Sequence, residues 1–449
     1  MKKIYFVTLC AALGGLLFGY DTAVISGAIG NLTLFFKLSP AQTGWAISCA
    51  LVGCLVGAFF SSKLSTVWGR KKSMIIASVL FLICAIGTAL PDKFSVFVAF
   101  RIIGGVGVGL ASMVVPMYIA EIAPSDKRGS LVAYNQLAVV IGMVLVFFVN
   151  YFIALQGNED WNLNEGWRWM FGSGIIPAVL YLIVLFFIPE SPRWYAEKLM
   201  HTEALKVLQQ FNSPEVSNKT LEEIKYSFEN KENVSPNTLW QPGLRKALWV
   251  GIGLSVFQQI TGINAILYYA PEIFKSFGST ANASLLETSM LGVVNLMATI
   301  TSIRLVDKSG RLPLLKIGSL GMLIALLIVG LSAYFKISGA WLLPVLLIFM
   351  ASFSISWGPV VWVLLSEIFP NKVRSLALAL AVFIQWIANF LVSQTFPMMT
   401  ENTWLKEKFN GSFPFLLFAL FCLGALIFVS KAVPETKNKT LEEMNAIWQ

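Results

Sequence analysis

The chain has 449 residues, of which 56% are hydrophobic and 13% charged, and its mean hydropathy is +0.72. A soluble domain of average composition is about 25% charged, so this composition excludes a chain of soluble domains. The formal net charge of +9 does not indicate nucleic-acid binding either. The basic residues gather in alternate loops between apolar stretches, which is typical of the cytoplasmic loops of a membrane protein.

Apolar stretches of roughly 20 residues recur along the chain, and each is long enough to cross about 30 Å of hydrocarbon as a helix. We therefore expect an all-α integral membrane protein with twelve transmembrane helices. The expected spans are 5–30, 43–66, 72–91, 95–120, 131–154, 167–188, 247–276, 285–306, 312–335, 340–369, 372–396 and 411–433. The basic loops and the even number of spans place both termini in the cytoplasm of a cell-membrane protein.

The two halves of the chain resemble each other. Three short motifs of the first half recur in the second at nearly the same spacing: EIAPSDKR (121–128) as EIFPNKVR (367–374), Gly69-Arg70 as Gly310-Arg311, and PES (189–191) as PET (434–436). These repeats predict two six-helix bundles of the same orientation, as in major facilitator transporters; a duplicated scaffold without a transport role is the alternative. The expected parts are a bundle (1–189), a cytoplasmic helical linker (190–246), a second bundle (247–433) and a cytoplasmic tail (434–449).

The sequence shows no pattern of residues that is typical of a metal or cofactor site. It has one histidine, His201, and no Walker A phosphate-binding motif. All five cysteines lie in or beside apolar stretches without metal-ligand spacing, so we expect packing residues rather than disulfides or metal ligands. They are Cys10, Cys49, Cys54, Cys84 and Cys422. Neither a cofactor nor an enzyme activity is expected.

Two ionisable residues lie inside apolar spans, Asp21 in the first and Arg101 in the fourth. A charge within a span costs about 2.5–3.5 kcal/mol on insertion scales, so such residues are functional candidates. A nearby arginine favours the charged form of a carboxyl group, and burial without a partner favours the neutral form. A pair that forms and breaks would therefore release and bind a proton; the alternative is a static ion pair between the two spans.

The seventh span carries three carboxamides, Gln258, Gln259 and Asn264, and Gly262 would loosen the helix between them. A neutral sugar presents hydroxyl groups, so its site needs amide, indole or phenol groups rather than charges. Amides in an apolar helix are costly unless they face a wet cavity or bond to another helix, and bonding between helices is the alternative role. Further candidates are Gln136, Asn295, Trp362, Gln385 and Trp386.

Four motifs are similar to signatures of the sugar porter family within the major facilitator superfamily. They are GGLLFGYD (14–21), PESPRW (189–194), QQITGIN (258–264) and PETK (434–437). Within that family, segments 18–27 and 357–370 look most like bacterial D-xylose–proton symporters. The resemblance implies the major facilitator fold and a neutral sugar substrate.

The resemblance also implies roles for individual residues. Proton-coupled members carry an acid–arginine pair that matches Asp21 and Arg101, and passive mammalian-type facilitators usually have asparagine at the acid position. The positions that match sugar contacts are Gln136, Gln258, Gln259, Asn264, Asn295, Trp362 and Gln385, and the chemistry of indole groups adds Trp386.

Two groups of residues are expected to act as gates. Tyr268 and Tyr269 lie toward the outer end of the seventh span and are similar to an extracellular gate, with an aromatic belt at the membrane surface as the alternative. Charged residues at the cytoplasmic ends are expected to form ion pairs between the bundles, with topology signals as the alternative. These are Arg70, Glu121, Arg128, Glu190, Arg311, Glu367, Arg374 and Glu435.

The sequence thus predicts a proton-coupled importer of a monosaccharide, of the D-xylose or D-glucose type, that works by alternating access. A passive uniporter is the first alternative. A transporter-like sugar sensor is the second, although the tail is short for docking a signalling partner. We expect the neutral sugar, protons and the lipid bilayer as partners, no nucleic acid, and function as a monomer.

Overall fold

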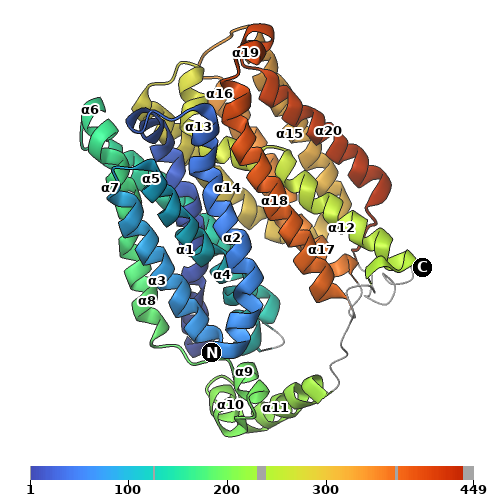
Figure 1. Ribbon diagram of the computed structural model, residues 1–449. Helices are drawn as coiled ribbons and strands as arrows, with labels where there is room; N and C mark the ends of the chain where they lie inside the picture. The colour runs from blue at the N-terminus through green and yellow to red at the C-terminus, as the bar shows by residue number, and fades with distance from the viewer. Residues whose placement is uncertain (1, 125–126, 230–238, 370–372, 438–449) are drawn as a thin grey trace. The chain divides into compact units, whose positions relative to one another are not determined.

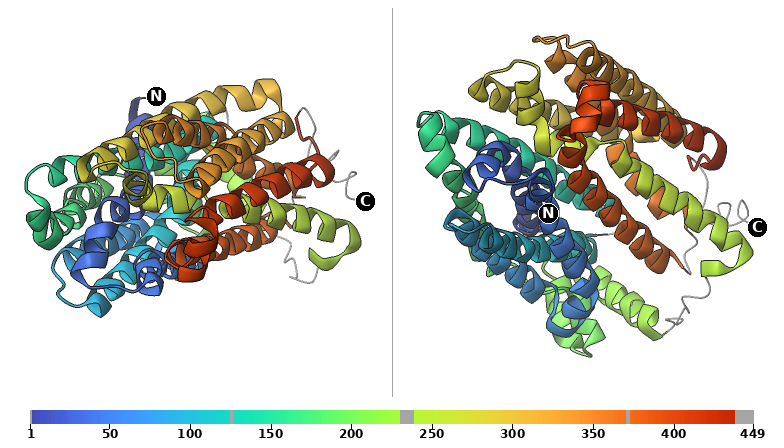
Figure 2. Two further views of the ribbon diagram at one scale, coloured as in Figure 1. Left: turned by 90° about the horizontal axis from the view of Figure 1, so that it is seen from above. Right: turned by 45° about the horizontal axis from the view of Figure 1, so that its top comes forward.

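The computed structural model describes residues 2–124, 127–229, 239–369 and 373–437, and all secondary structure in these residues is helical. The chain divides into two compact units. Unit 1 comprises Met1–Asn31 and Cys49–Glu232, and unit 2 comprises Leu32–Ser48 and Asn233–Gln449. Within each unit the long helices run side by side as a bundle (Figures 1 and 2). The all-α prediction is confirmed.

Unit 1 contains most of the first six spans. Its long helices are α1 (Lys2–Phe35), α2 (Pro40–Trp68), α3 (Arg70–Ala89), α4 (Phe94–Ile122) and α5 (Arg128–Ala154). The adjoining ends of α1 and α2 belong to unit 2. The sixth span is divided among α6 (Glu159–Trp161), the π-helix η1 (Asn162–Gly166), α7 (Trp167–Gly172) and α8 (Ile175–Leu185).

Three short linker helices follow the sixth span in unit 1. They are α9 (Pro192–Glu197), α10 (His201–Leu208) and α11 (Pro214–Glu229). Ala196, Ala204, Leu208 and Leu221 form a small buried core between them. The amphipathic helices expected in this polar segment are therefore present, and they pack on one another.

Unit 2 contains the last six spans. Its helices are α12 (Pro242–Ile260), α13 (Ile263–Ser276), α14 (Ala281–Ser309), α15 (Arg311–Tyr334), α16 (Leu342–Ile355), α17 (Trp357–Ile368), α18 (Arg374–Thr400), α19 (Thr403–Phe409) and α20 (Phe413–Ala432). The first two form the seventh span, and α16 and α17 form the tenth. The short α19 lies between the last two spans.

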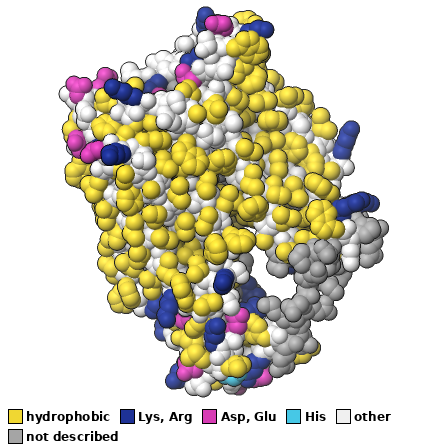
Figure 3. Space-filling view, in the orientation of Figure 1, with side chains coloured by type: hydrophobic (Ala, Val, Ile, Leu, Met, Phe, Trp, Pro, Cys, Tyr) yellow, Lys and Arg dark blue, Asp and Glu magenta, His cyan; other side chains and the backbone are white. Residues whose placement is uncertain are grey.

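Twelve helical segments within the described residues are long and apolar enough to cross a membrane, which confirms the predicted number. On the face shown in Figure 3, hydrophobic side chains cover the middle of the bundles, and charged side chains gather at the ends and over the linker helices. The sixth segment begins at Glu159 rather than at 167, because α6 and η1 continue the helical path ahead of the apolar stretch.

In unit 2, two of the expected continuous spans are broken. The span expected at 247–276 is interrupted at Gly262, whose φ of 90° is left-handed, a conformation that glycine adopts without a steric cost. The span expected at 340–369 is interrupted at Ser356, with φ −120° and ψ −88°. Each break exposes backbone groups in the middle of a span, where only a polar or wet environment can satisfy them.

Gly69 and Gly310 begin the two repeated motifs and have the same backbone conformation. Gly69 precedes α3 with φ 98° and ψ 164°, and Gly310 precedes α15 with φ 86° and ψ 169°. This region of the backbone map is accessible to glycine almost alone. A side chain at Gly69 would also meet the carboxyl group of Glu190.

We expect Gly69→Ala to lower the stability of the protein by roughly 1–3 kcal/mol through backbone strain alone. Contact with Glu190 adds to this loss. Thermal unfolding in detergent, followed by intrinsic fluorescence, measures the effect. Gly278→Ala is the matched control for strain without crowding, because Gly278 has a φ of 105° and no atom within 4 Å of the added carbon. A melting temperature for Gly69→Ala equal to or above that of Gly278→Ala would contradict the expectation.

Candidate transport site

The ion pair between Asp21 and Arg101 lies inside unit 1. Asp21 is near the middle of α1, and Arg101 reaches it from α4. Arg101 Nη1 donates to Asp21 Oδ2 at 3.1 Å and to the Asp21 carbonyl oxygen at 3.2 Å. The arginine side chain is 1% exposed and the aspartate side chain 13%. The predicted contact is therefore present, and the carboxylate is its more accessible member.

Two further groups surround this pair. The guanidinium of Arg101 lies 5.7 Å from the centre of the Phe171 ring, which covers it from α7. Cys84 of α3 donates its S–H to Asp21 Oδ1 at 3.5 Å. Sequence reasoning treated Cys84 as packing and missed this contact. Its place between Phe81 and Thr88 on a helix carries no signal that it faces Asp21.

A narrow cavity opens beside Asp21. It is lined by Leu17, Tyr20, Asp21, Val24, Phe81, Ala85, Thr88, Phe171 and Gly174, which come from α1, α3, α7 and the turn before α8. Tyr20 Oη and Ser173 Oγ lie 2.7 Å apart next to it. The free space is too small for a monosaccharide but suits water beside polar groups. Because Asp21 is part of the lining, a water molecule in this cavity would lie next to it.

The amides of the seventh span form a hydrogen-bonded network inside unit 2. Gln258 Nε2 donates to the carbonyl oxygens of Trp357 at 2.8 Å and Gly358 at 3.2 Å. Gln258 Oε1 accepts from Gln385 Nε2 at 2.6 Å and from Gln259 Nε2 at 3.2 Å. Gln258 is thus the centre of the network and joins α12 to α17 and α18.

Both helix breaks lie beside this network. The left-handed Gly262 ends α12 and lets Asn264 of α13 donate to Gln259 Oε1 at 2.6 Å. Trp357, whose carbonyl oxygen accepts from Gln258, is the first residue of α17 after the break at Ser356. That backbone acceptor was missed by sequence reasoning, which considers side chains; the Gly-Pro step after Trp357 was the available signal of a broken helix.

The other candidate sugar-contacting residues lie outside this network. Asn295 Oδ1 accepts from Ser354 Oγ of α16 at 2.8 Å and from Thr299 Oγ1 at 3.4 Å. Trp362 is 41% exposed on α17, and Trp386 is half-buried on α18. Gln136 is exposed on α5 and belongs to unit 1. The structure therefore brings Gln258, Gln259, Asn264 and Gln385 together within unit 2.

Both tyrosines expected at the outer gate are buried in unit 2. Tyr269 Oη donates to the Ser393 carbonyl oxygen of α18 at 3.1 Å, and its ring lies 5.0 Å from that of Phe396. Tyr268 is next to it on α13. Burial of both rings does not fit a belt facing the membrane surface, and their role as a gate stays a prediction.

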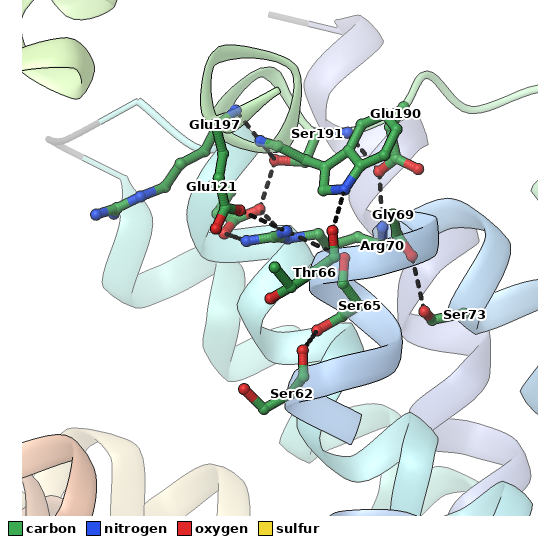
Figure 4. Close-up of polar contacts among 12 residues, drawn as sticks. Ser62, Ser65, Thr66, Gly69, Arg70, Ser73, Glu121, Glu190, Ser191 and Glu197 are labelled. Carbon is green, nitrogen blue, oxygen red and sulfur yellow. Dashed lines mark hydrogen bonds and ion pairs between the residues drawn. The ribbon is translucent and has the colours of Figure 1, made fainter. Parts of the chain in front are cut away.

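A cluster around Arg70 joins the ends of α3 and α4 to the segment before α9 (Figure 4). Arg70 donates to both carboxylate oxygens of Glu121, at 2.8 and 2.9 Å, and lies 3.5 Å from Glu197. Glu190 Oε1 accepts from the backbone N–H of Arg70 at 2.9 Å. Ser191 Oγ donates to Glu121. All of these contacts lie within unit 1.

The second copy of the motif builds the same cluster in unit 2. Arg311 donates to both carboxylate oxygens of Glu367, at 2.8 and 3.2 Å. Glu435 accepts from the backbone N–H of Arg311 at 3.1 Å, and Thr436 Oγ1 donates to Glu367. The bonds of both clusters therefore join residues within one unit. Pairing between the bundles stays a prediction.

The other two residues expected at the inner gate, Arg128 and Arg374, are not bonded to a carboxylate by any contact described above. Arg128 is exposed at the start of α5. Arg374 donates to the Phe369 carbonyl oxygen through Nε and Nη2, both at 3.2 Å. These two arginines follow the short segments whose middle residues, 125–126 and 370–372, lie outside the described part of the chain.

The equivalent acids Glu190 and Glu435 differ in proton affinity. Burial raises the pKa of Glu190 above its ordinary value, and three backbone N–H groups offset this only in part. Burial acts in the same direction on Glu435, but four backbone N–H groups outweigh it and hold its pKa below the ordinary value. Of the two motif copies, the second therefore holds the more firmly ionised carboxylate.

A family model described as "Sugar (and other) transporter" matches residues 7–448. The D-xylose-proton symporter of Escherichia coli (strain K12) is 44% identical over 473 residues, which cover 99% of this chain and 96% of the relative. The glucose facilitated diffusion protein of Zymomonas mobilis subsp. mobilis is 37% identical over 461 residues, with 99% and 97% covered.

A solved structure has the same fold. It is described as the inward open conformation of the xylose transporter XylE from E. coli, and it aligns with a TM-score of 0.88 at 43% identity. The alignment covers 99% of this chain and all of that one.

Twelve apolar helices in the described part of the chain, together with the similarity to sugar transporters over nearly its whole length, define a membrane transporter of the major facilitator fold, not an enzyme. The chain belongs to the sugar transporter family.

Proposed function

We propose that this protein imports a monosaccharide of the D-xylose or D-glucose type together with protons, by alternating access in the cell membrane. The direct contact between Asp21 and Arg101 inside a membrane bundle carries the proposal, because a transporter of a neutral sugar needs no such pair for binding. A relative described as a D-xylose-proton symporter, matching 99% of the chain, supports it.

Asp21 is the proposed proton site and Arg101 its partner. In the paired state the guanidinium stabilises the carboxylate, so the proton is released. When the pair separates, a carboxylate in an apolar bundle loses its partner and takes up a proton to become neutral. Water in the neighbouring cavity would bring the proton to the carboxyl group. Each cycle of pairing then moves a proton with the sugar.

The proposed sugar cradle is built on the network around Gln258. Amides that already bond to one another and to backbone oxygens are held in fixed orientations, and a sugar can bond to their remaining donors and acceptors. One such acceptor is Gln385 Oε1, which is buried without a hydrogen bond among the described residues. During the transport cycle, four further residues are proposed to complete the cradle: Asn295, Trp362, Trp386 and Gln136.

During transport, the two bundles are proposed to move relative to each other about the sugar. The proposed parts of the chain are a first bundle (1–189), a linker (190–246), a second bundle (247–433) and a tail (434–449). Tyr268 and Tyr269 act as the outer gate and the charged clusters as the inner one. Both termini lie in the cytoplasm, as the basic loops indicate, and a single chain embedded in lipid performs the whole cycle.

Proteoliposomes loaded with a pH dye test the proposal. We expect external D-xylose or D-glucose to acidify the lumen with the wild-type protein. Asp21→Asn should reduce this acidification to background and retain exchange of labelled sugar, because the neutral amide resembles the protonated carboxyl group. Asp92→Asn is the matched control, since Asp92 also pairs with an arginine, Arg168 at 2.8 Å, but is 87% exposed.

Sugar flux without acidification in the wild type would contradict proton coupling. It would leave the passive uniporter, as in the relative described as a facilitated diffusion protein. Binding of sugar with no flux would favour the sensor. Acidification that persists in Asp21→Asn would show that another group carries the proton.

A further inference from the structure

The two carboxylate oxygens of Asp21 accept hydrogen bonds from different helices. Oδ2 is bonded to Arg101 of α4 at 3.1 Å, and Oδ1 to the thiol of Cys84 of α3 at 3.5 Å. Cys84 is completely buried. Arg101 is thus bonded to Oδ2, and the other carboxylate oxygen, Oδ1, is in contact with a neutral donor, the Cys84 thiol.

The fold makes room for this thiol. Gly104 lies opposite on α4, and a side-chain carbon there would meet both Sγ and Cβ of Cys84 and lie 3.6 Å from Asp21 Oδ1. The thiol fills the space that the glycine leaves. One turn along α3, the hydroxyl of Thr88 bonds to the Cys84 carbonyl oxygen at 2.7 Å, so it does not compete for the carboxylate.

Asp21 also lines the narrow cavity, together with residues of α3. Ala85 and Thr88, which flank Cys84 on α3, line it together with Tyr20 and Asp21 itself. A proton that arrives through this cavity therefore passes residues of α3, the helix that carries Cys84.

The charged and titratable groups around Asp21 come from four helices. Arg101 of α4 is the cation, and Cys84 belongs to α3. Cys49 and Cys54 of α2 are within electrostatic reach of the carboxylate. Tyr20 is adjacent on α1 and bonds to Ser173 instead. The residues that α7 and the following turn contribute to the cavity, Phe171 and Gly174, do not titrate.

We propose that Cys84 is a positioning residue that sets the proton affinity of Asp21 through its hydrogen bond to Oδ1. A donor to the charged form of a carboxyl group opposes its protonation. A thiol is a weaker donor than a hydroxyl group, so it orients the carboxylate and leaves it easier to protonate. After protonation, the sulfur can act as a weak acceptor for the new O–H. The proton comes from water, and the thiol keeps its own.

This inference rests on the proposed function, since it needs Asp21 as the proton site. The experiment measures the initial rate of sugar-driven lumen acidification against external pH for the wild type, Cys84→Ser and Cys84→Ala. We expect the pH midpoint to fall for Cys84→Ser, whose hydroxyl is the stronger donor, and to rise for Cys84→Ala, which has no donor. Each shift should be roughly 0.5–1 pH unit.

Cys422→Ser and Cys422→Ala are the matched controls. Cys422 is an equally buried thiol on α20 of unit 2, and its substitution should leave the midpoint unchanged. Sugar binding at one pH, followed by tryptophan fluorescence, confirms that each variant is folded. If Cys84→Ala does not fold, the acid shift of Cys84→Ser relative to the wild type still tests the inference.

Midpoints for both Cys84 variants that equal the wild type, or that move in the same direction, would overturn the inference. In that case Asp21→Asn still separates the two proposals. Loss of acidification in Asp21→Asn leaves the symport proposal in place and removes only the role of Cys84. Persistence of acidification in Asp21→Asn removes the proposed function itself.

Discussion

Arg101→Met is expected to destabilise the folded protein by about 3–5 kcal/mol, because it leaves the carboxylate of Asp21 in the bundle without its partner. Methionine keeps much of the side-chain length and packs against Phe171, so the loss of charge dominates. The fraction of folded protein and the melting temperature in detergent measure the effect. Proton-coupled uptake should be lost as well.

A second substitution separates charge from packing. In Arg101→Met combined with Asp21→Asn, the unpaired charge is gone, and we expect most of the stability to return while proton coupling does not. Lys406→Met is the matched control in an exposed pair, Lys406 with Glu401 at 2.6 Å, where about 0–1 kcal/mol is expected. If the double variant is as unstable as Arg101→Met alone, the arginine stabilises the bundle by packing and the electrostatic explanation is wrong.

Gln258→Ala is expected to weaken sugar binding roughly 10- to 100-fold. Gln258 donates to the Trp357 carbonyl oxygen and accepts from Gln385, so its removal breaks the network at its centre. Leaving buried polar groups unpaired costs about 1–3 kcal/mol each, and 1.4 kcal/mol corresponds to a tenfold change in affinity. Binding of D-xylose and D-glucose to purified protein, measured by calorimetry, gives the ratio.

Asn389→Ala is the matched control for this prediction. Asn389 is a buried amide one turn from Gln385 on α18, and its Oδ1 accepts from Ser393 Oγ at 3.0 Å within the same helix. It joins no second helix through that bond, so sugar affinity should change by less than about threefold. Equal losses for Gln258→Ala and Asn389→Ala would mean that the amides act on folding and not on the sugar.

The number of membrane helices could be predicted from the sequence because it depends on local composition. A stretch of apolar residues long enough to cross the bilayer has to satisfy its backbone hydrogen bonds internally, and the helix does so without help from the rest of the chain. Asp21 and Arg101 could be singled out for the same reason. A charge in such a stretch is costly, so each residue is conspicuous in its own span.

The partners of these residues depend on how the helices pack. Nothing local to Cys84 indicates that its thiol faces Asp21; the contact exists because Gly104, on another helix, leaves room for it. The breaks at Gly262 and Ser356 likewise turn backbone and side-chain groups of separate spans toward Gln258. The sequence could group Gln258, Gln259 and Asn264, but it could not show that Gln385 joins them while Asn295 is bonded to Ser354.

The repeated charged motifs show both what the sequence predicts and what the packing of the helices decides. Their recurrence in the sequence predicted two similar bundles. In each copy the arginine, Arg70 or Arg311, binds both oxygens of the acid, Glu121 or Glu367, while pairing between the bundles stays a prediction. By itself, then, the sequence determined the helical class, the membrane environment, the internal repeat and the residues whose charge is out of place. Only the tertiary structure decided which groups touch, because a hydrogen bond depends on ångström-scale distances between helices that are far apart in the chain.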